Sequence, residues 1–217
     1  MLTPRRIPSH ELLDEHDAPR AEMEKSLRDL RRINKYCGGT PIYRSLVRQF
    51  APRSILDIGT GTSDLLDGVD NVPLRIGLDF KIDHLLYLRE GSRVRRVVGD
   101  AHRLPFRDNA VDLVTSAHFF HHFSPDENAS ILTESLRVAK RGVAVNDTRR
   151  HYAPLLFVLV LGALRLVGRI TRFDAPASVR QGYTLDEARE VARNVRGATK
   201  ASVVRKFPFR FGLLLWK

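Results

Sequence analysis

Cysteine is nearly absent from this chain, because Cys37 is the only one among 217 residues. A single cysteine excludes an intramolecular disulfide and any zinc site built from several cysteines. We therefore expect a cytoplasmic protein of ordinary domain size that depends on a hydrophobic core for its stability. A secretion signal is not expected either, since Pro4, Arg5 and Arg6 are not followed by an apolar segment.

Acidic residues are also in the minority. The 25 Asp and Glu residues stand against 36 Lys and Arg, which gives a net charge of +11. Such an excess favours an acidic partner, whether nucleic acid, an anionic membrane or an anionic substrate. The arginine-rich background composition of the chain explains the charge equally well.

The stretch from Ile55 to Leu66 passes from a short apolar run through two glycines into a helical pattern. This order predicts a strand, a ligand-binding loop and a helix. Gly59 and Gly61 would let a ligand approach the backbone, with the first N–H groups of the helix nearby. Asp57 adds a carboxylate at the end of the strand.

Apolar runs that fit strands alternate with helical patterns in the middle of the chain. The runs cover residues 54–58, 74–79, 94–98, 111–115 and 142–145, and helices are predicted after Thr62, at 82–90, and from capping boxes at Ser124 and Thr184. The segments 201–207 and 209–216 resemble an antiparallel hairpin. The pattern predicts an α/β fold: a single Rossmann-like domain whose mainly parallel seven-stranded sheet carries helices on both faces.

Asp79 ends the second run about twenty residues after the glycines, where an α/β nucleotide site places the acid that binds a ribose. Asp100 closes the third run. Four segments around these strand ends have the character of sequence motifs: 56–61, 77–79, 99–106 and 111–114. Together they resemble the successive motifs of class I S-adenosylmethionine-dependent methyltransferases, especially the group that includes the ubiquinone and menaquinone C-methyltransferases, and the resemblance covers about residues 40 to 150.

The resemblance implies a role for each matching residue. Gly59 and Gly61 line the methionine part of S-adenosyl-L-methionine, Asp79 binds the ribose hydroxyls, and Asp100 with Ala101 reaches the adenine. The remaining residues of the predicted cofactor-binding set adjoin the motifs or the strand ends. They are Asp57, Thr60, Phe80 and Ser116.

Histidines and aromatic residues crowd the end of the fourth strand, at residues 115–123. Histidine titrates near neutral pH, so His121 or His122 is a candidate catalytic base; alternatively, both order the loop against Asp147 or a backbone carbonyl. We expect no metal, because no carboxylate or cysteine is spaced to complete a site. Residues 116–119 also lack the Asn/Asp-Pro-Pro-aromatic motif of related enzymes that methylate base or amide nitrogens, so no nucleic acid partner is expected.

Residues 1–20 have no apolar period and are predicted to form a flexible, loosely attached arm, with the methyltransferase domain at 21–217. Residues 21–52 are predicted to form two helices, which the resemblance places over the cofactor and substrate. Arg32 is there a candidate for the cofactor carboxylate, or belongs to a solvated helix face. An insertion at 148–183 contains an apolar segment, 153–164, that is too short to span a bilayer. Three interpretations stay open for it: a helix packed on its own domain, a lid over a lipophilic substrate, or peripheral membrane contact through 153–170.

The sequence thus predicts O- or C-methylation of a small lipophilic acceptor such as a phenol, a quinone-like ring or a polyketide-type enol. One alternative is an NAD-dependent oxidoreductase. Against it, Asp64 occupies the position of the third glycine in the Gly-x-Gly-x-x-Gly motif of NAD-binding proteins. The Asp57 carboxylate would also repel a pyrophosphate, whereas it suits an ammonium group. The other alternative is a catalytically silent cofactor-binding module that docks on a membrane or a partner enzyme.

Overall fold

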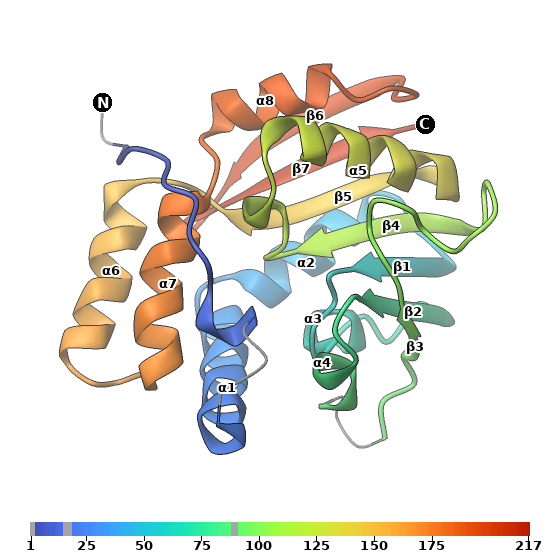
Figure 1. Cartoon of the computed structure of the whole chain (residues 1–217). Helices are drawn as coiled ribbons and strands as arrows, with labels where there is room; N and C mark the ends of the chain where they lie inside the picture. The colour runs from blue at the N-terminus through green and yellow to red at the C-terminus, as the bar shows by residue number, and fades with distance from the viewer. Residues whose placement is uncertain (1–2, 15–18, 88–90) are drawn as a thin grey trace.

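The computed structural model describes residues 3–14, 19–87 and 91–217. Within these residues, seven strands form one sheet of order β3-β2-β1-β4-β5-β7-β6 (Figure 1). The strands are β1 (Ser54–Ile58), β2 (Leu74–Asp79), β3 (Arg95–Val98), β4 (Val111–Ala117), β5 (Ala139–Thr148), β6 (Lys200–Lys206) and β7 (Arg210–Trp216). The first five pair in parallel, and β7 pairs antiparallel with both β5 and β6. The predicted fold class is confirmed.

Helices cover both faces of the sheet, and others stand beyond its carboxyl edge (Figure 1). The helices are α1 (Arg20–Tyr36), α2 (Gly39–Arg48), α3 (Asp64–Asp67), α4 (Ile82–Leu86), α5 (Pro125–Val138), α6 (Tyr152–Ala163), α7 (Arg169–Gln181) and α8 (Leu185–Arg193), with short 3-10 turns η1 (Leu12–Asp14) and η2 (Phe120–His122). One hydrophobic cluster joins the sheet to α5 and α8, and a second joins the opposite face to α2 and α3. Helix α4 occupies the first part of the helix predicted at 82–90. Residues 88–90 of that prediction lie outside the described residues.

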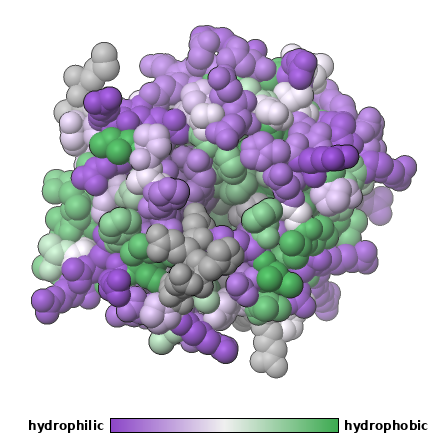
Figure 2. All heavy atoms as spheres, viewed as in Figure 1, coloured by the Kyte–Doolittle hydropathy of each residue, from purple (hydrophilic) through white to green (hydrophobic). Residues whose placement is uncertain are grey.

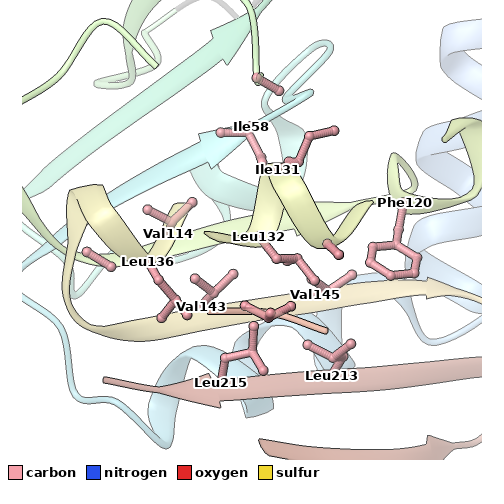
Figure 3. Packing of buried hydrophobic residues seen from close by; sticks show 14 of the residues in the cluster. Ile58, Val114, Phe120, Ile131, Leu132, Leu136, Val143, Val145, Leu213 and Leu215 are labelled. Atoms are coloured by element: carbon pink, nitrogen blue, oxygen red, sulfur yellow. The ribbon is translucent and has the colours of Figure 1, made fainter. Parts of the chain in front are cut away.

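The two clusters follow the alternation of side chains along buried strands. Val143 and Val145 of β5 face α5, where they meet Leu132 and Leu136 (Figure 3), whereas Ala144 between them belongs to the opposite cluster. Because both faces of the central strands are buried, apolar residues follow one another along them, as in Ile55-Leu56, Leu113-Val114 and Val143-Ala144-Val145, which is typical of parallel sheets. The sheet is therefore fixed between two helical layers and holds its carboxyl edge in place.

Local signals fixed some helix starts correctly and one incorrectly. The capping boxes are formed, since the side chains of Ser124 and Thr184 each accept the backbone N–H of the third helical residue, whose carboxylate accepts the backbone N–H of the cap residue. Thr40 followed by Pro41 has the sequence of a helix N-cap and first turn, but helix α2 begins at Gly39, with Gly38 as N-cap in the left-handed region at φ 82°. The tight turn from α1 into α2 requires a glycine there, and this requirement overrides the threonine signal.

The described part of the amino-terminal arm is attached to the domain. The backbone N–H groups of Leu12 and Leu13 donate to the Asp174 carboxylate on α7 at 2.8 and 3.0 Å. The Arg6 guanidinium donates to the carbonyl oxygen of Phe123 at 2.8 Å. The loose attachment predicted for residues 1–20 is therefore not what residues 3–14 show, because buried polar partners on distant elements hold them; residues 1–2 and 15–18 lie outside the described residues.

The insertion at 148–183 forms two helices side by side, α6 and α7 (Figure 1). Helix α7 packs on α1, but α6 buries only Pro154 and Leu155. In the described part of the chain, no helix combines the length and the apolar character needed to cross a membrane.

Candidate active site

A cavity of about 480 Å³ lies at the carboxyl ends of β1, β2 and β4. The glycine loop and the strand ends form one wall, while α1 and the segment around η1 form the other. Nine of the predicted site residues line it: Asp57, Gly59, Thr60, Asp79, Phe80, Asp100, Ala101, His121 and His122. Gly61 and Ser116 do not line it, and the Oγ of Ser116 is buried without a hydrogen-bond partner in the described residues.

The glycine loop is shaped by its two glycines. Gly59 and Gly61 have φ values of 64° and 53°, in the left-handed region that other residues rarely adopt. A Cβ on Gly59 would lie 2.2 Å from the Phe119 ring, whereas a Cβ on Gly61 would meet nothing within 4 Å. Gly59 thus lets an aromatic ring from the loop after β4 close over the backbone of the loop after β1.

Asp57 is almost completely buried at the floor of the cavity, 3% exposed. Thr115 Oγ1 and the Tyr43 hydroxyl both donate to its Oδ1, at 2.6 and 3.1 Å. Burial raises the pKa of Asp57, and these donors oppose the effect. A buried carboxylate held from below stabilises a cation placed above it. Tyr43 was not predicted, although a hydroxyl in the apolar stripe of α2 requires a buried partner.

The other two acids stand at the ends of the neighbouring strands. Asp79 accepts backbone N–H groups of Gly61 at 2.8 Å and Lys81 at 2.9 Å, so it ties the glycine loop to β2. Asp100 keeps 55% of its side chain exposed. The backbone N–H and the ring of His102 both bond to it, and these contacts lower its pKa. Three acids from three strands therefore converge on one cavity.

His121 lies between two carboxylates. Its Nδ1 is 2.8 Å from Asp147 Oδ1, and its Nε2 is 3.4 Å from Glu11 Oε1, an ion-pair distance without hydrogen-bond geometry. Burial lowers the pKa of His121, but Asp147 and Glu11 outweigh burial and raise it to about 10. The ring is therefore an imidazolium near neutral pH and has no lone pair to accept a proton. This environment argues against His121 as the base and favours the alternative of loop ordering by Asp147.

His118 is a site residue that the predicted set omitted. Its backbone is left-handed, with φ 55°, and its ring lines the cavity. Burial lowers the pKa of His118 well below 6.5, so the ring is neutral near pH 7. Its Nε2 is buried and has no hydrogen-bond partner in the described part of the chain. A ligand in the cavity would satisfy this nitrogen once the ring turned to bring it to the cavity surface. The role of His122, which is exposed at the rim, stays a prediction.

The outer part of the cavity is apolar, and it lies under α1 and η1 rather than under the insertion. The apolar lining residues there are Leu13, Leu27, Leu30, Phe119 and Phe123. From 148–183, only Ser178 of α7 contributes. The lid interpretation of 153–164 is thus corrected, because α6 packs on the far side of α7. Arg31 lines the cavity and pairs with Asp64 at 2.7 Å, whereas the predicted Arg32 points elsewhere.

Among the residues that the structure describes, two groups of side chains have metal-ligand spacing. They are Glu11 with His121 and His122, and His118 with His121 and Asp147, each with ligand atoms within 4.8 Å of one another. Both groups share His121, which would have to lose its proton before it could bind a cation. The expectation of no metal stays a prediction.

Comparison with known proteins gives a consistent picture. Residues 56–145 match the family model described as a methyltransferase domain. The demethylmenaquinone methyltransferase of Thermotoga maritima is 32% identical over 108 residues, which cover 44% of this chain and 43% of the relative. That of Thermus thermophilus is 39% identical over 105 residues, 45% and 47% of the two chains. The chain thus spans less than half the length of these curated relatives.

Solved structures extend the likeness to the whole fold. The plantazolicin methyltransferase BpumL in complex with SAH has a TM-score of 0.72 at 12% identity, over 94% of this chain and 92% of that one. Human N-acetylserotonin methyltransferase in complex with SAM has a TM-score of 0.64 at 15% identity, over 91% and 57%. At these identities the likeness shows the fold alone. Together the comparisons confirm the resemblance to class I methyltransferases that the four motifs indicate.

Proposed function

We propose that this chain, whose residues 56–145 match a methyltransferase domain, transfers a methyl group from S-adenosyl-L-methionine to a small lipophilic acceptor. One observation carries the proposal. Asp57, Asp79 and Asp100, from the ends of three strands, line a single cavity beside the Gly59 turn. Sequence relatives named demethylmenaquinone methyltransferase, and fold neighbours solved with SAM or SAH, support the same cofactor.

The residues of the cavity suit the cofactor group by group. Asp57 presents a buried carboxylate to the ammonium group, Asp79 has oxygen lone pairs left for the ribose diol, and exposed Asp100 reaches the adenine. The left-handed Gly59 lets the Phe119 ring lie against the glycine loop beside the cavity, where a side chain would clash with it. When bound, the cofactor supplies the electrophilic methyl of a sulfonium, so the protein's share is alignment, water exclusion and proton removal.

The apolar outer cavity supports a lipophilic acceptor. Leu27, Leu30 and Phe123 would bury an aromatic or quinone-like ring, which is stabilised by about 25 cal/mol per Å² of apolar surface removed from water. A phenol, a demethylated quinone in its reduced form and an enol all offer such surface together with one hydroxyl. Either the oxygen or the adjacent carbon would then take the methyl group.

His118 is the residue best suited to that hydroxyl. Its imidazole is neutral, and after a turn of the ring its buried, unpartnered Nε2 would accept a hydrogen bond from the acceptor and take its proton as the methyl is transferred. The imidazolium of His121 cannot do this, but it holds the η2 turn, on which His122 lies, against Asp147. His121 is in this proposal a positioning residue.

Isothermal titration calorimetry with S-adenosylhomocysteine tests the cofactor assignment. Asp79→Asn should bind at least about tenfold more weakly than the unmodified protein, because one charged hydrogen-bond partner is worth about 1.5–3 kcal/mol. Asp83→Asn, an exposed acid on the adjacent α4, is the matched control and should bind normally. Heat with NADH but none with S-adenosylhomocysteine would instead establish the oxidoreductase alternative.

Turnover with labelled S-adenosylmethionine tests the acceptor class. We expect methylation of hydrophobic phenols, reduced quinones or enols, and His118→Ala should lower kcat by about 10²–10⁴ while S-adenosylhomocysteine binding is kept. Full activity of His118→Ala with loss in His122→Ala would move the base to His122. Cofactor binding without turnover on any acceptor would favour the silent module.

A further inference from the structure

Helix α6 exposes an apolar surface that the rest of the chain does not cover. Of its twelve residues, only Pro154 and Leu155 are buried. The exposed large side chains of α6 and the turn that follows it form what we term the α6 surface: Tyr152, Leu156, Leu159, Val160, Leu164 and Leu166. Figure 2 shows hydrophobic atoms gathered at the left edge of the molecule, where Figure 1 places α6. A contiguous apolar patch of this kind marks an interaction site.

Positive charge predominates around the α6 surface. Residues 149–173 contain five arginines and no aspartate or glutamate. Arg165, Arg169 and Arg172 are exposed at the end of α6 and on α7. The stem of Arg172 lies beside α6, since a Cβ on Gly162 would be 3.4 Å from its Cγ. Glu22 pairs with Arg169 at 3.5 Å, in an ion pair whose arginine remains 75% exposed.

An apolar centre rimmed by cations selects among possible occupants. A second copy of the chain would place the same arginines opposite one another in a symmetric interface, and such like-charge contacts are unfavourable. A bound substrate is not the occupant, because α6 contributes no residue to the cavity. An anionic lipid surface meets both features, since its headgroups attract arginine and its acyl region accepts leucine.

We propose that the α6 surface docks the protein on the surface of anionic phospholipid bilayers, with α6 lying in the plane of the interface. The twelve residues of α6 suit this position, being too few to cross the hydrocarbon core. Helices α6, α7 and α1 stand beyond the same carboxyl edge of the sheet as the cavity (Figure 1). Docking is independent of the proposed methyl transfer, because none of the residues involved lines the cavity.

Vesicle flotation with the full chain tests the docking. We expect the protein to float with vesicles that contain phosphatidylglycerol, and to float less with pure phosphatidylcholine or at high salt. Leu156→Glu combined with Leu164→Glu should lower the bound fraction at least about tenfold. Leu86→Glu on α4 is the matched control and should leave it unchanged, since Leu86 is 63% exposed and the two α6 leucines are each 64% exposed. Arg169→Ala with Arg172→Ala should weaken binding to anionic vesicles alone.

Three results would overturn the proposal. The first is no flotation with anionic vesicles at low salt, and the second is an equal loss in the α6 double variant and in Leu86→Glu. The third is a dimer in light scattering that the α6 double variant converts to monomer without any vesicle effect, which would assign the surface to a second copy. Circular dichroism and S-adenosylhomocysteine binding report separately on folding and on the cavity, so a failed methyltransferase assay leaves the flotation result interpretable.

Discussion

The His121 ion pairs make a quantitative prediction about stability and pH. The pKa of His121 is raised from 6.5 to about 10 in the folded protein. A group whose pKa is higher in the folded state stabilises that state fully below its unfolded pKa, and the stabilisation is lost as pH rises through the folded pKa. The relevant window is therefore pH 6.5 to about 10.

The magnitude follows from the size of the shift. Each pH unit in the window removes about 1.4 kcal/mol of unfolding free energy, so the loss reaches about 5 kcal/mol at its upper end. This is a large share of the 5–15 kcal/mol typical of folded domains, quoted as a rough range. His121→Asn carries no charge at any pH and leaves the carboxylates of Asp147 and Glu11 without the cation that lies between them. At neutral pH we expect it to be less stable by about 3–5 kcal/mol, the cost of breaking a buried pair.

Urea denaturation followed by circular dichroism at a series of pH values measures both effects. The difference in unfolding free energy between the unmodified protein and His121→Asn should shrink steadily between pH 6.5 and about 10. His10→Asn, at an exposed position of the same arm, should stay within about 0.5 kcal/mol of the unmodified protein. A difference that is constant across the window would refute a charged His121.

Three further predictions concern single contacts. Gly59→Ala should lower the unfolding free energy by about 2 kcal/mol or more and abolish S-adenosylhomocysteine binding in calorimetry, because the new Cβ would lie 2.2 Å from the Phe119 ring. Gly61→Ala is the control: its Cβ would enter open space, so it should lower the unfolding free energy by only about 1–2 kcal/mol, the cost of the left-handed backbone. Tyr43→Phe removes one of the donors to buried Asp57 and should lower the unfolding free energy in urea denaturation by about 1–3 kcal/mol. An unchanged unfolding free energy would contradict the hydrogen bond. Ser124→Ala breaks the capping box of α5 and should cost about 1 kcal/mol in the same assay, while an unchanged midpoint would show that the cap contributes nothing.

The parts of the fold that could be predicted from sequence are those that neighbouring residues determine. Strand β1, its glycine loop and the capping boxes at Ser124 and Thr184 all lie within a few residues of their own signals. Asp57, Asp79 and Asp100 were predicted to converge because parallel strands bring their carboxyl ends to one edge, and they line one cavity. Periodicity together with chain topology was sufficient for this part of the site.

Contacts between distant segments account for what sequence reasoning missed. The apolar composition of α6 predicts a helix but not the face that it buries, and its neighbour α7 covers little of it. Tyr43 belongs by spacing to a core stripe, and only the approach of α2 to β1 gives its hydroxyl a carboxylate. A pattern in one element cannot indicate which polar atom of another element will lie opposite.

The buried charges around His121 could not be predicted from the sequence for the same reason. They also explain why the His121 ring is protonated. Glu11 and Asp147 both lie within ion-pair distance of His121, and Arg210 is a further buried cation; each of the four is at most 9% exposed. Asp147 and Glu11 stabilise the charged form of His121. Asp147 also favours the charged form of Arg210, whose burial lowers its pKa to about 10. Two carboxylates thus balance two cations, which is the condition under which buried charges persist. A neutral His121 would leave this group with a net negative charge away from water. Because its members come from the arm, η2, β5 and β7, the charge balance exists only in the folded chain, and with it the assignment of His118 rather than His121 as the neutral histidine of the cavity.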